Sequence, residues 1–236
     1  MWGTILRNEK GFVPVESGDL MKVVVFGDSI TKGVFVEEEQ AFPKLVEAKT
    51  GLTVIGRGVP GNTTAQALMR FESDVLALDP DAVIIEFGMN DHFLVAEDQH
   101  KVAPKEFRAN LRTMVAGAKA AGIRPFLMTI HPVIEGDDAH CYYSRHKQEF
   151  YLPFGGANSL IELYNTIIRD CAEETSADLI DVASCFAEAL CKGVLLEELL
   201  FNLKNSDLND GVHPTALGHE LYAQAVVDVF KAASLY

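Results

Sequence analysis

The sequence lacks the features that would direct it to a membrane or to nucleic acid. No stretch of its 236 residues approaches the roughly 18 consecutive apolar residues that a membrane-spanning helix needs. Only 20 lysines and arginines stand against 34 aspartates and glutamates, which gives a formal net charge of −14. Because this charge repels phosphate groups, we expect neither nucleic acid nor an anionic membrane as a partner.

Motifs for redox chemistry and nucleotide binding are also missing. The four cysteines form no CxxC pair, and Cys171 and Cys185 fall in segments of helical pattern, so we expect reduced thiols. Charged residues interrupt the first 18 residues, and without a signal peptide we expect a cytoplasmic protein. No GxxxxGK[ST] motif occurs and no GxGxxG follows a strand, which argues against a nucleotide or flavin binder.

What is present is an alternation of apolar runs and helical patterns. This alternation predicts an α/β fold with a parallel sheet and helices on both of its faces, because right-handed crossovers return each helix to the sheet. No linker or repeat interrupts it, so we expect an N-terminal extension over residues 1–20 and one domain over 21–236. The five predicted strands are 22–27, 53–55, 82–87, 124–130 and 178–182, and the predicted helices are 42–49, 64–78, 104–121, 159–174 and 215–233.

Three polar turns follow predicted strands and carry residues of catalytic type. Ser29, the loop that contains Gly61, and Asn90 each come after a strand end. Since ligands bind beyond the carboxyl ends of parallel strands, we expect these residues to meet along one edge of the sheet.

A serine hydroxyl needs a base within hydrogen-bond reach, and a third group to orient that base, before it attacks a carbonyl. The segment Asp210-Gly-Val-His213-Pro offers both, with Gly211 allowing a tight turn. Backbone N–H groups at Ser29 and Gly61 and the side-chain amide of Asn90 could stabilise the oxyanion that develops.

Simpler interpretations exist for each of these residues. Ser29 could merely cap the helix after the first strand, and Asn90 and Asp91 could merely shape a turn. Asp207 is a minor alternative to Asp210 as the orienting acid. The serine, the imidazole and the carboxylate together favour catalysis over these alternatives.

Four segments in order resemble the blocks of the SGNH, or GDSL-type, hydrolases. They are Gly-Asp-Ser-Ile at 27–30, Gly-Asn-Thr at 61–63, Gly-Met-Asn-Asp at 88–91 and Asp-Gly-Val-His-Pro at 210–214. The resemblance implies a flavodoxin-like three-layer α/β/α sandwich with a parallel five-stranded sheet, and neither a metal nor a cofactor. It also implies Ser29 as nucleophile, His213 as base, Asp210 as its orienter, and Ser29, Gly61 and Asn90 as oxyanion donors.

The second block departs from the family pattern. The family usually has Asn-Arg-Gly-Val-Ser-Gly there, whereas this chain has Gly-Arg-Gly-Val-Pro-Gly at 56–61. The Gly61 N–H stays available, but the hydrogen bonds that hold the loop must differ.

Residues 131–156 form a long, irregular and aromatic-rich segment on the side where ligands bind, and long loops in compact domains are often functional. Tyr142, Tyr143 and Phe154 are therefore candidate substrate-binding residues, although they could equally cover the sheet edge or a subunit contact. His140 and His146 lack the carboxylate pattern of a metal site.

The sequence thus favours a serine hydrolase that cleaves small-molecule carboxylic esters through an acyl-enzyme on Ser29. Its substrates would be short-chain acyl or acetyl esters, with carbohydrate esters among the candidates. An acyl thioesterase or lysophospholipase of the same fold is the first alternative, and a non-catalytic carbohydrate- or acyl-binding module is the second. A homo-oligomer is left open.

Overall fold

Five buried strands form the centre of the molecule. The computed structural model describes residues 5–8, 11–14, 20–135 and 147–236. All neighbouring strands of the central sheet pair in parallel, in the order β4-β3-β5-β8-β9. The strands are β3 (Lys22–Gly27), β4 (Thr53–Gly58), β5 (Ala82–Glu86), β8 (Arg124–Met128) and β9 (Asp178–Ile180).

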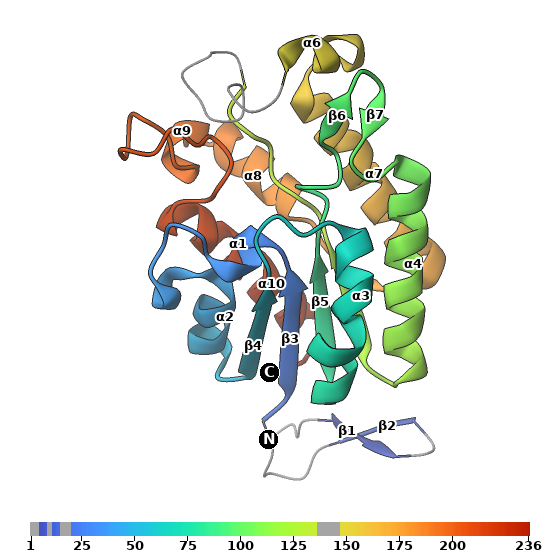
Figure 1. Ribbon diagram of the computed structural model, residues 1–236. Helices are drawn as coiled ribbons and strands as arrows, with labels where there is room; N and C mark the ends of the chain where they lie inside the picture. The colour runs from blue at the N-terminus through green and yellow to red at the C-terminus, as the bar shows by residue number, and fades with distance from the viewer. Residues whose placement is uncertain (1–4, 9–10, 15–19, 136–146) are drawn as a thin grey trace.

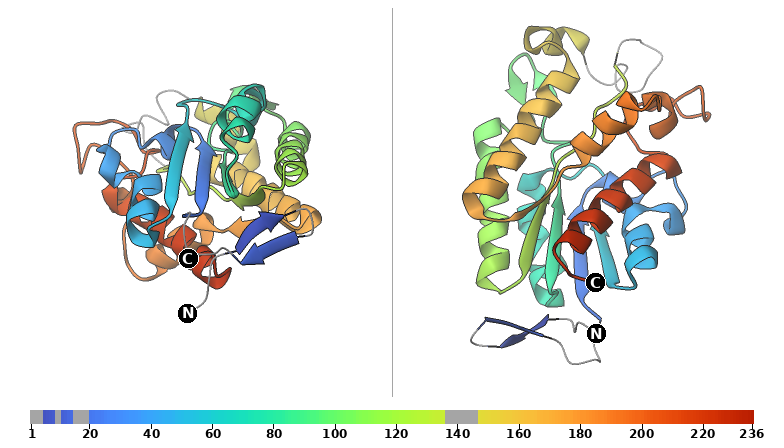
Figure 2. Two further views of the ribbon diagram at one scale, coloured as in Figure 1. Left: turned by 90° about the horizontal axis from the view of Figure 1, so that it is seen from below. Right: turned by 180° about the vertical axis from the view of Figure 1, so that it is seen from behind.

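Helices cover both faces of this sheet, because successive side chains of a buried strand point to opposite sides. Val23 and Val25 join one hydrophobic cluster, and Val24 and Phe26 join the other. Helix α10 crosses the near face of the sheet in the view from behind (Figure 2). The first cluster is covered by α2 (Phe42–Thr50), α8 (Val182–Cys191) and α10 (Ala216–Ala232), and the second by α3 (Thr64–Asp74), α4 (Pro104–Ala120) and α7 (Ala157–Thr175).

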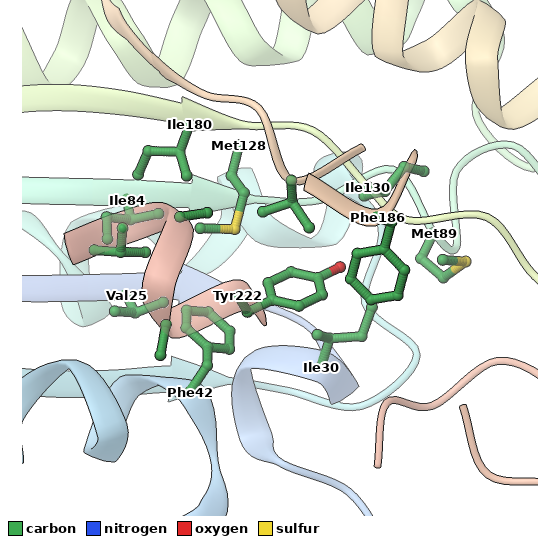
Figure 3. Close-up of a cluster of buried hydrophobic side chains, with 14 of the residues drawn as sticks. Val25, Ile30, Phe42, Ile84, Met89, Met128, Ile130, Ile180, Phe186 and Tyr222 are labelled. Carbon is green, nitrogen blue, oxygen red and sulfur yellow. The ribbon is translucent and has the colours of Figure 1, made fainter. Parts of the chain in front are cut away.

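The first cluster extends to the carboxyl ends of β3 and β5. Tyr222 of α10 points between Phe186 and Phe42, and Ile30 and Met89 stand at the same end of the cluster (Figure 3). The predicted three-layer α/β/α sandwich with a parallel five-stranded sheet is therefore confirmed.

The structure contains several elements that the sequence patterns do not predict. Helix α8, by contrast, confirms the helical pattern expected around Cys185; Asp181 caps this helix, and its side chain accepts a hydrogen bond from the Ser184 N–H. Within the segment 131–156, expected to be irregular, the described part contains α6 (Gln148–Tyr151) and a 3-10 helix at Leu152–Phe154. Other additions are α1 (Ser29–Lys32), α9 (Leu196–Leu199), and the strands β6 (Leu94–Ala96) and β7 (Gln99–His100).

The strands that the structure describes before residue 21 form a sheet of their own. Strands β1 (Ile5–Asn8) and β2 (Gly11–Pro14) pair only with each other, as an antiparallel hairpin below the sheet in Figure 1. The division into an extension and one domain at residue 20 stays a prediction.

The structure also bears on the expectations for membrane spans and cysteines. Among the helices of the described ranges, none is long and apolar enough to cross a membrane. Cys171, Cys185 and Cys191 are free thiols, while Cys141 lies outside the described residues.

Candidate active site

The site lies where the strand order reverses. After β3 the chain adds β4 on one side and then β5 on the other, and ligands bind at such a reversal beyond the carboxyl ends of the strands. Ser29 begins α1 directly beyond β3, and Asn90 follows β5 (Figure 1). The edge predicted from the sequence is therefore the edge at which these residues stand.

Ser29 is not the cap of its helix. Asp28 is the capping residue, and its Oδ1 atom accepts a hydrogen bond of 2.9 Å from the Ile30 N–H. The alternative that Ser29 is only a helix cap is therefore wrong, because its hydroxyl makes a different bond. Ser29 is 7% exposed and its Oγ atom lies 3.0 Å from Nε2 of His213.

The imidazole of His213 joins Ser29 to Asp210. Its Nδ1–H donates to Oδ1 of Asp210 over 2.9 Å, while the Val212 and His213 N–H groups donate to Oδ2. Burial alone would raise the pKa of Asp210, but these hydrogen bonds and the adjacent imidazole lower it below its usual value. Asp210 is therefore a carboxylate at neutral pH and can only accept from His213.

The loop that carries Asp210 and His213 is held from two sides. On one side, the buried His131 donates from Nε2 to the Val212 carbonyl over 2.7 Å and accepts from the Tyr222 hydroxyl over 2.6 Å. On the other side, the Phe201 N–H donates to the His213 carbonyl over 2.9 Å. Burial lowers the pKa of His131 to about 4, so the ring is neutral when it makes these bonds.

His131 does not stand out in the sequence, because its partners lie more than 80 residues away. The one available signal is its place just beyond β8, on the same edge of the sheet as Ser29 and Asn90.

Asn90 is tied directly to the residue before the nucleophile. Its side-chain amide donates to Oδ2 of Asp28 over 2.7 Å and to the Asn62 carbonyl over 3.1 Å. Both amide protons thus have acceptors within the protein, so an oxyanion at this site would have to share or replace the Asn62 carbonyl. The amide is nonetheless oriented by a carboxylate, which makes a stronger bond than a neutral acceptor does.

A second buried acid, Glu86, is hydrogen bonded to the residues on either side of Ser29 and Ile30. Glu86, at the end of β5, accepts from the Thr31 hydroxyl over 2.9 Å and from the Asp28 N–H over 3.4 Å. Burial raises the pKa of Asp28 to about 6, and burial together with the neighbouring Asp28 raises the pKa of Glu86 well above its usual value. Because two adjacent buried carboxylates repel each other, Glu86 is the protonated member of the pair.

Arg70 of α3 makes several hydrogen bonds to the unusual second block and its surroundings. Its guanidinium donates to the Gly27 carbonyl over 2.7 Å, to Oδ1 of Asn62 over 2.8 Å and to the Arg57 carbonyl over 3.1 Å. It also lies over the Phe26 ring, 4.3 Å from the ring centre. One side chain thus joins the strand before Ser29 to the loop around Gly61.

The backbone conformation at position 61 favours glycine. Its φ is +79°, in the left-handed region that other residues rarely adopt. Space is not the reason, because a Cβ atom there would meet no atom within 4 Å. Within the described part of the chain, no hydrogen bond occupies the N–H groups of Gly61 and Ser29.

Of the three aromatic candidates for substrate binding, only Phe154 lies in the part of the chain that the structure describes. Tyr142 and Tyr143 lie outside the described residues, as do His140 and His146. Phe154 is partly buried and packs against the His100 ring, 5.9 Å away between centroids. Its role in substrate binding stays a prediction.

Asp91 and His219 are buried, and both contact neighbouring elements of the fold. Asp91, interpreted from the sequence as shaping a turn, accepts from the N–H and the hydroxyl of Thr64 and so joins the turn after β5 to α3. His219 is fully buried and stacks on Phe42 of α2. Among the residues that the structure describes, no group of three or more histidines, cysteines and acids could hold a metal ion.

A Ser–His–Asp chain of hydrogen bonds at the carboxyl edge of a doubly wound sheet is the arrangement of the serine hydrolases. The profile of the GDSL-like lipase/acylhydrolase family matches residues 25–221, and the chain belongs to this family.

Three known proteins illustrate the similarity. The chain is 34% identical to the uncharacterized lipoprotein YqeF of Bacillus subtilis, over 87% of this chain and 88% of that protein. It is 28% identical to an acetylxylan esterase of Geobacillus stearothermophilus, over 76% of this chain and 73% of that protein. The crystal structure of a lipase/acylhydrolase from Enterococcus faecalis has the same fold, with a TM-score of 0.68 and 24% identity over 91% of this chain and 97% of that one.

Proposed function

We propose that this carboxylic ester hydrolase cleaves its substrates through an acyl-enzyme on Ser29. The observation that carries the proposal is the pair of hydrogen bonds on His213, 3.0 Å to Ser29 and 2.9 Å to Asp210. These distances allow proton transfer from the serine hydroxyl to the imidazole without rearrangement.

In the first half of the reaction, Ser29 Oγ attacks the ester carbonyl and passes its proton to His213 Nε2. The developing oxyanion is stabilised by the N–H groups of Ser29 and Gly61 and by the Asn90 amide, which turns from the Asn62 carbonyl toward it. His213 then protonates the departing alcohol, and Asp210 stabilises the imidazolium meanwhile.

In the second half, a water molecule replaces the alcohol. His213 removes one proton from this water as its oxygen attacks the acyl carbon. The Ser29–acyl bond then breaks, His213 returns the proton to Ser29 Oγ, and the carboxylic acid is released. No step needs a cofactor, since every proton moves between Ser29, His213, the alcohol and water.

We propose short acyl groups, acetyl in particular, as the acyl part of the substrate. The acetylxylan esterase among the relatives supports this choice and makes acetylated carbohydrates the first esters to test. A preference for acyl thioesters or lysophospholipids in the same assays would favour the alternative activities.

The test compares hydrolysis of p-nitrophenyl acetate by the wild type and by Ser29→Ala. We expect the variant to lose activity by several orders of magnitude, because nothing else at the site supplies the attacking oxygen. A fluorophosphonate probe should label the wild type at Ser29 only. An active Ser29→Ala variant would overturn the proposal, and an unlabelled, inactive wild type would favour a non-catalytic binding module.

The location of the protein is a separate proposal. The name of the Bacillus relative describes that protein as a lipoprotein, whereas the sequence of this chain predicts a cytoplasmic protein. Fractionation of cells that express the native chain would decide between the two.

A further inference from the structure

An exposed phenylalanine lies against the ring of His213. The centroids of the Phe35 and His213 rings are 5.1 Å apart, with the rings nearly perpendicular at 81°. Phe35 makes a second edge contact with Phe201, at 5.9 Å. Half of the Phe35 side chain is nevertheless exposed to solvent.

The backbone holds Phe35 in an unfavourable conformation. Its φ is +74°, in the left-handed region that bulky side chains rarely adopt. The preceding Val34 N–H donates to the Ser29 carbonyl over 3.1 Å, so the position of Phe35 is tied to the nucleophile. Strained residues of this kind occur mainly where function requires a side chain at one particular place.

Phe35, which packs on His213, is also one wall of a hollow. This hollow has a volume of about 650 Å³. Its apolar walls are Phe35, Phe201, Leu195 and Leu217, and polar side chains that include Gln40 and Lys204 line the remainder. Leu195 and Leu217 are 59% and 49% exposed, so apolar surface is available around the hollow.

The direction of proton transfer decides which part of a substrate reaches this hollow. His213 must protonate the oxygen of the departing alcohol, so that oxygen lies next to Nε2. The rest of the alcohol then extends past the imidazole, against whose ring Phe35 packs.

From this geometry we infer that Phe35 and Phe201 form the binding subsite for the alcohol part of the ester, and that they select alcohols that carry a ring. This inference rests on the proposed function. A ring with an apolar face, either aryl or pyranose, packs on an aromatic edge or face, whereas a small alkyl group covers little of it.

Competition between alcohols for one acyl-enzyme tests the inference directly. Phenyl acetate forms the acetyl-enzyme, and an added alcohol then attacks the acyl carbon in place of water, gives its proton to His213 and leaves as a new acetate ester. Benzyl alcohol and ethanol are added together, and the ratio of benzyl acetate to ethyl acetate is measured. This ratio is independent of how much of the enzyme is folded.

Phe35→Gly is the informative variant, because it removes the ring and also relieves the left-handed strain. We expect the benzyl-to-ethyl ratio to fall about 3- to 10-fold, the value of one aromatic contact, and Phe201→Leu to lower it in the same direction. Met69→Ala, which alters an exposed residue on α3, is the control and should leave the ratio unchanged.

The outcomes separate the two proposals. A ratio that stays within twofold of the wild type in Phe35→Gly would overturn the alcohol subsite while leaving the role of Ser29 intact. Hydrolysis by Ser29→Ala would instead overturn the proposed function. Repeating the competition with a methyl pyranoside in place of benzyl alcohol distinguishes a sugar subsite from an aryl subsite.

Discussion

The carboxylate of Asp28 and the side-chain amide of Asn90 are hydrogen bonded over 2.7 Å. This bond joins the residue before the nucleophile to the residue that we propose as an oxyanion donor, across 62 positions of the chain. Asp28 also caps α1 through its other oxygen, so one buried carboxylate holds both the helix of Ser29 and the amide of Asn90.

The first prediction concerns this bond. In Asp28→Asn, the new amide can still accept from the Ile30 N–H with its oxygen, but its NH₂ group then faces the NH₂ of Asn90. Asn90 loses its charged acceptor and its orientation, and we expect kcat to fall about 10- to 100-fold, as for the loss of one hydrogen bond to a charged group. Steady-state kinetics with p-nitrophenyl acetate measure this effect, and a kcat within twofold of the wild type would contradict it.

The second prediction concerns the pH dependence of stability. Burial raises the pKa of Asp91 to about 7 in the folded protein, above the value near 3.8 of a free side chain. The folded state therefore binds the proton more tightly, and the contribution of Asp91 to stability falls as the pH rises from about 4 to about 7. Asp91→Asn keeps an acceptor for Thr64 but cannot titrate.

Urea unfolding at pH 4.5 and pH 8 tests this sign. Relative to Asp91→Asn, the wild type should lose up to about 3 kcal/mol of unfolding free energy between the two pH values. A difference that is constant with pH, or that grows in favour of the wild type at pH 8, would show that Asp91 is ionised in the folded protein.

The third prediction concerns the support of the catalytic loop. His131→Phe keeps the stacking on Phe186, at 5.0 Å, but leaves the partly buried Val212 carbonyl without its donor. We expect a loss of about 1 to 3 kcal/mol of stability, together with a lower kcat because His213 is the next residue. Tyr222→Phe is the matched control: it removes only the hydroxyl that donates to His131, and should cost less in both measurements.

The fourth prediction concerns Arg70. Arg70→Lys keeps the positive charge, but its single nitrogen cannot reach the Gly27, Asn62 and Arg57 acceptors together. If Arg70 positions the Gly61 loop, kcat should fall while KM changes little, and Arg70→Met should lower kcat further. The exposed Arg112, whose ion pair with Glu174 spans 3.8 Å, provides the control substitution Arg112→Lys, for which we expect no change.

Much of the fold follows from local patterns. The predicted strand 22–27 has the observed bounds of β3. Helices α2, α4 and α10 each begin and end within one residue of the predicted helices. These elements are predictable because buried strands and amphipathic helices each have a characteristic hydrophobic pattern in the sequence. The helical pattern expected around Cys185 is confirmed by α8, whose buried residues Val182, Phe186 and Ala189 recur at helical spacing.

The sequence by itself determined which residues could carry the chemistry. Ser29, Asp210 and His213 stand out along the chain, because a nucleophile, a base and an acid have recognisable identities and lie in ordered blocks. Only the tertiary structure decided how they are supported. Arg70, Glu86, His131 and Phe35 act through partners far away in the chain, and such contacts exist only after the sheet has brought the strand ends together.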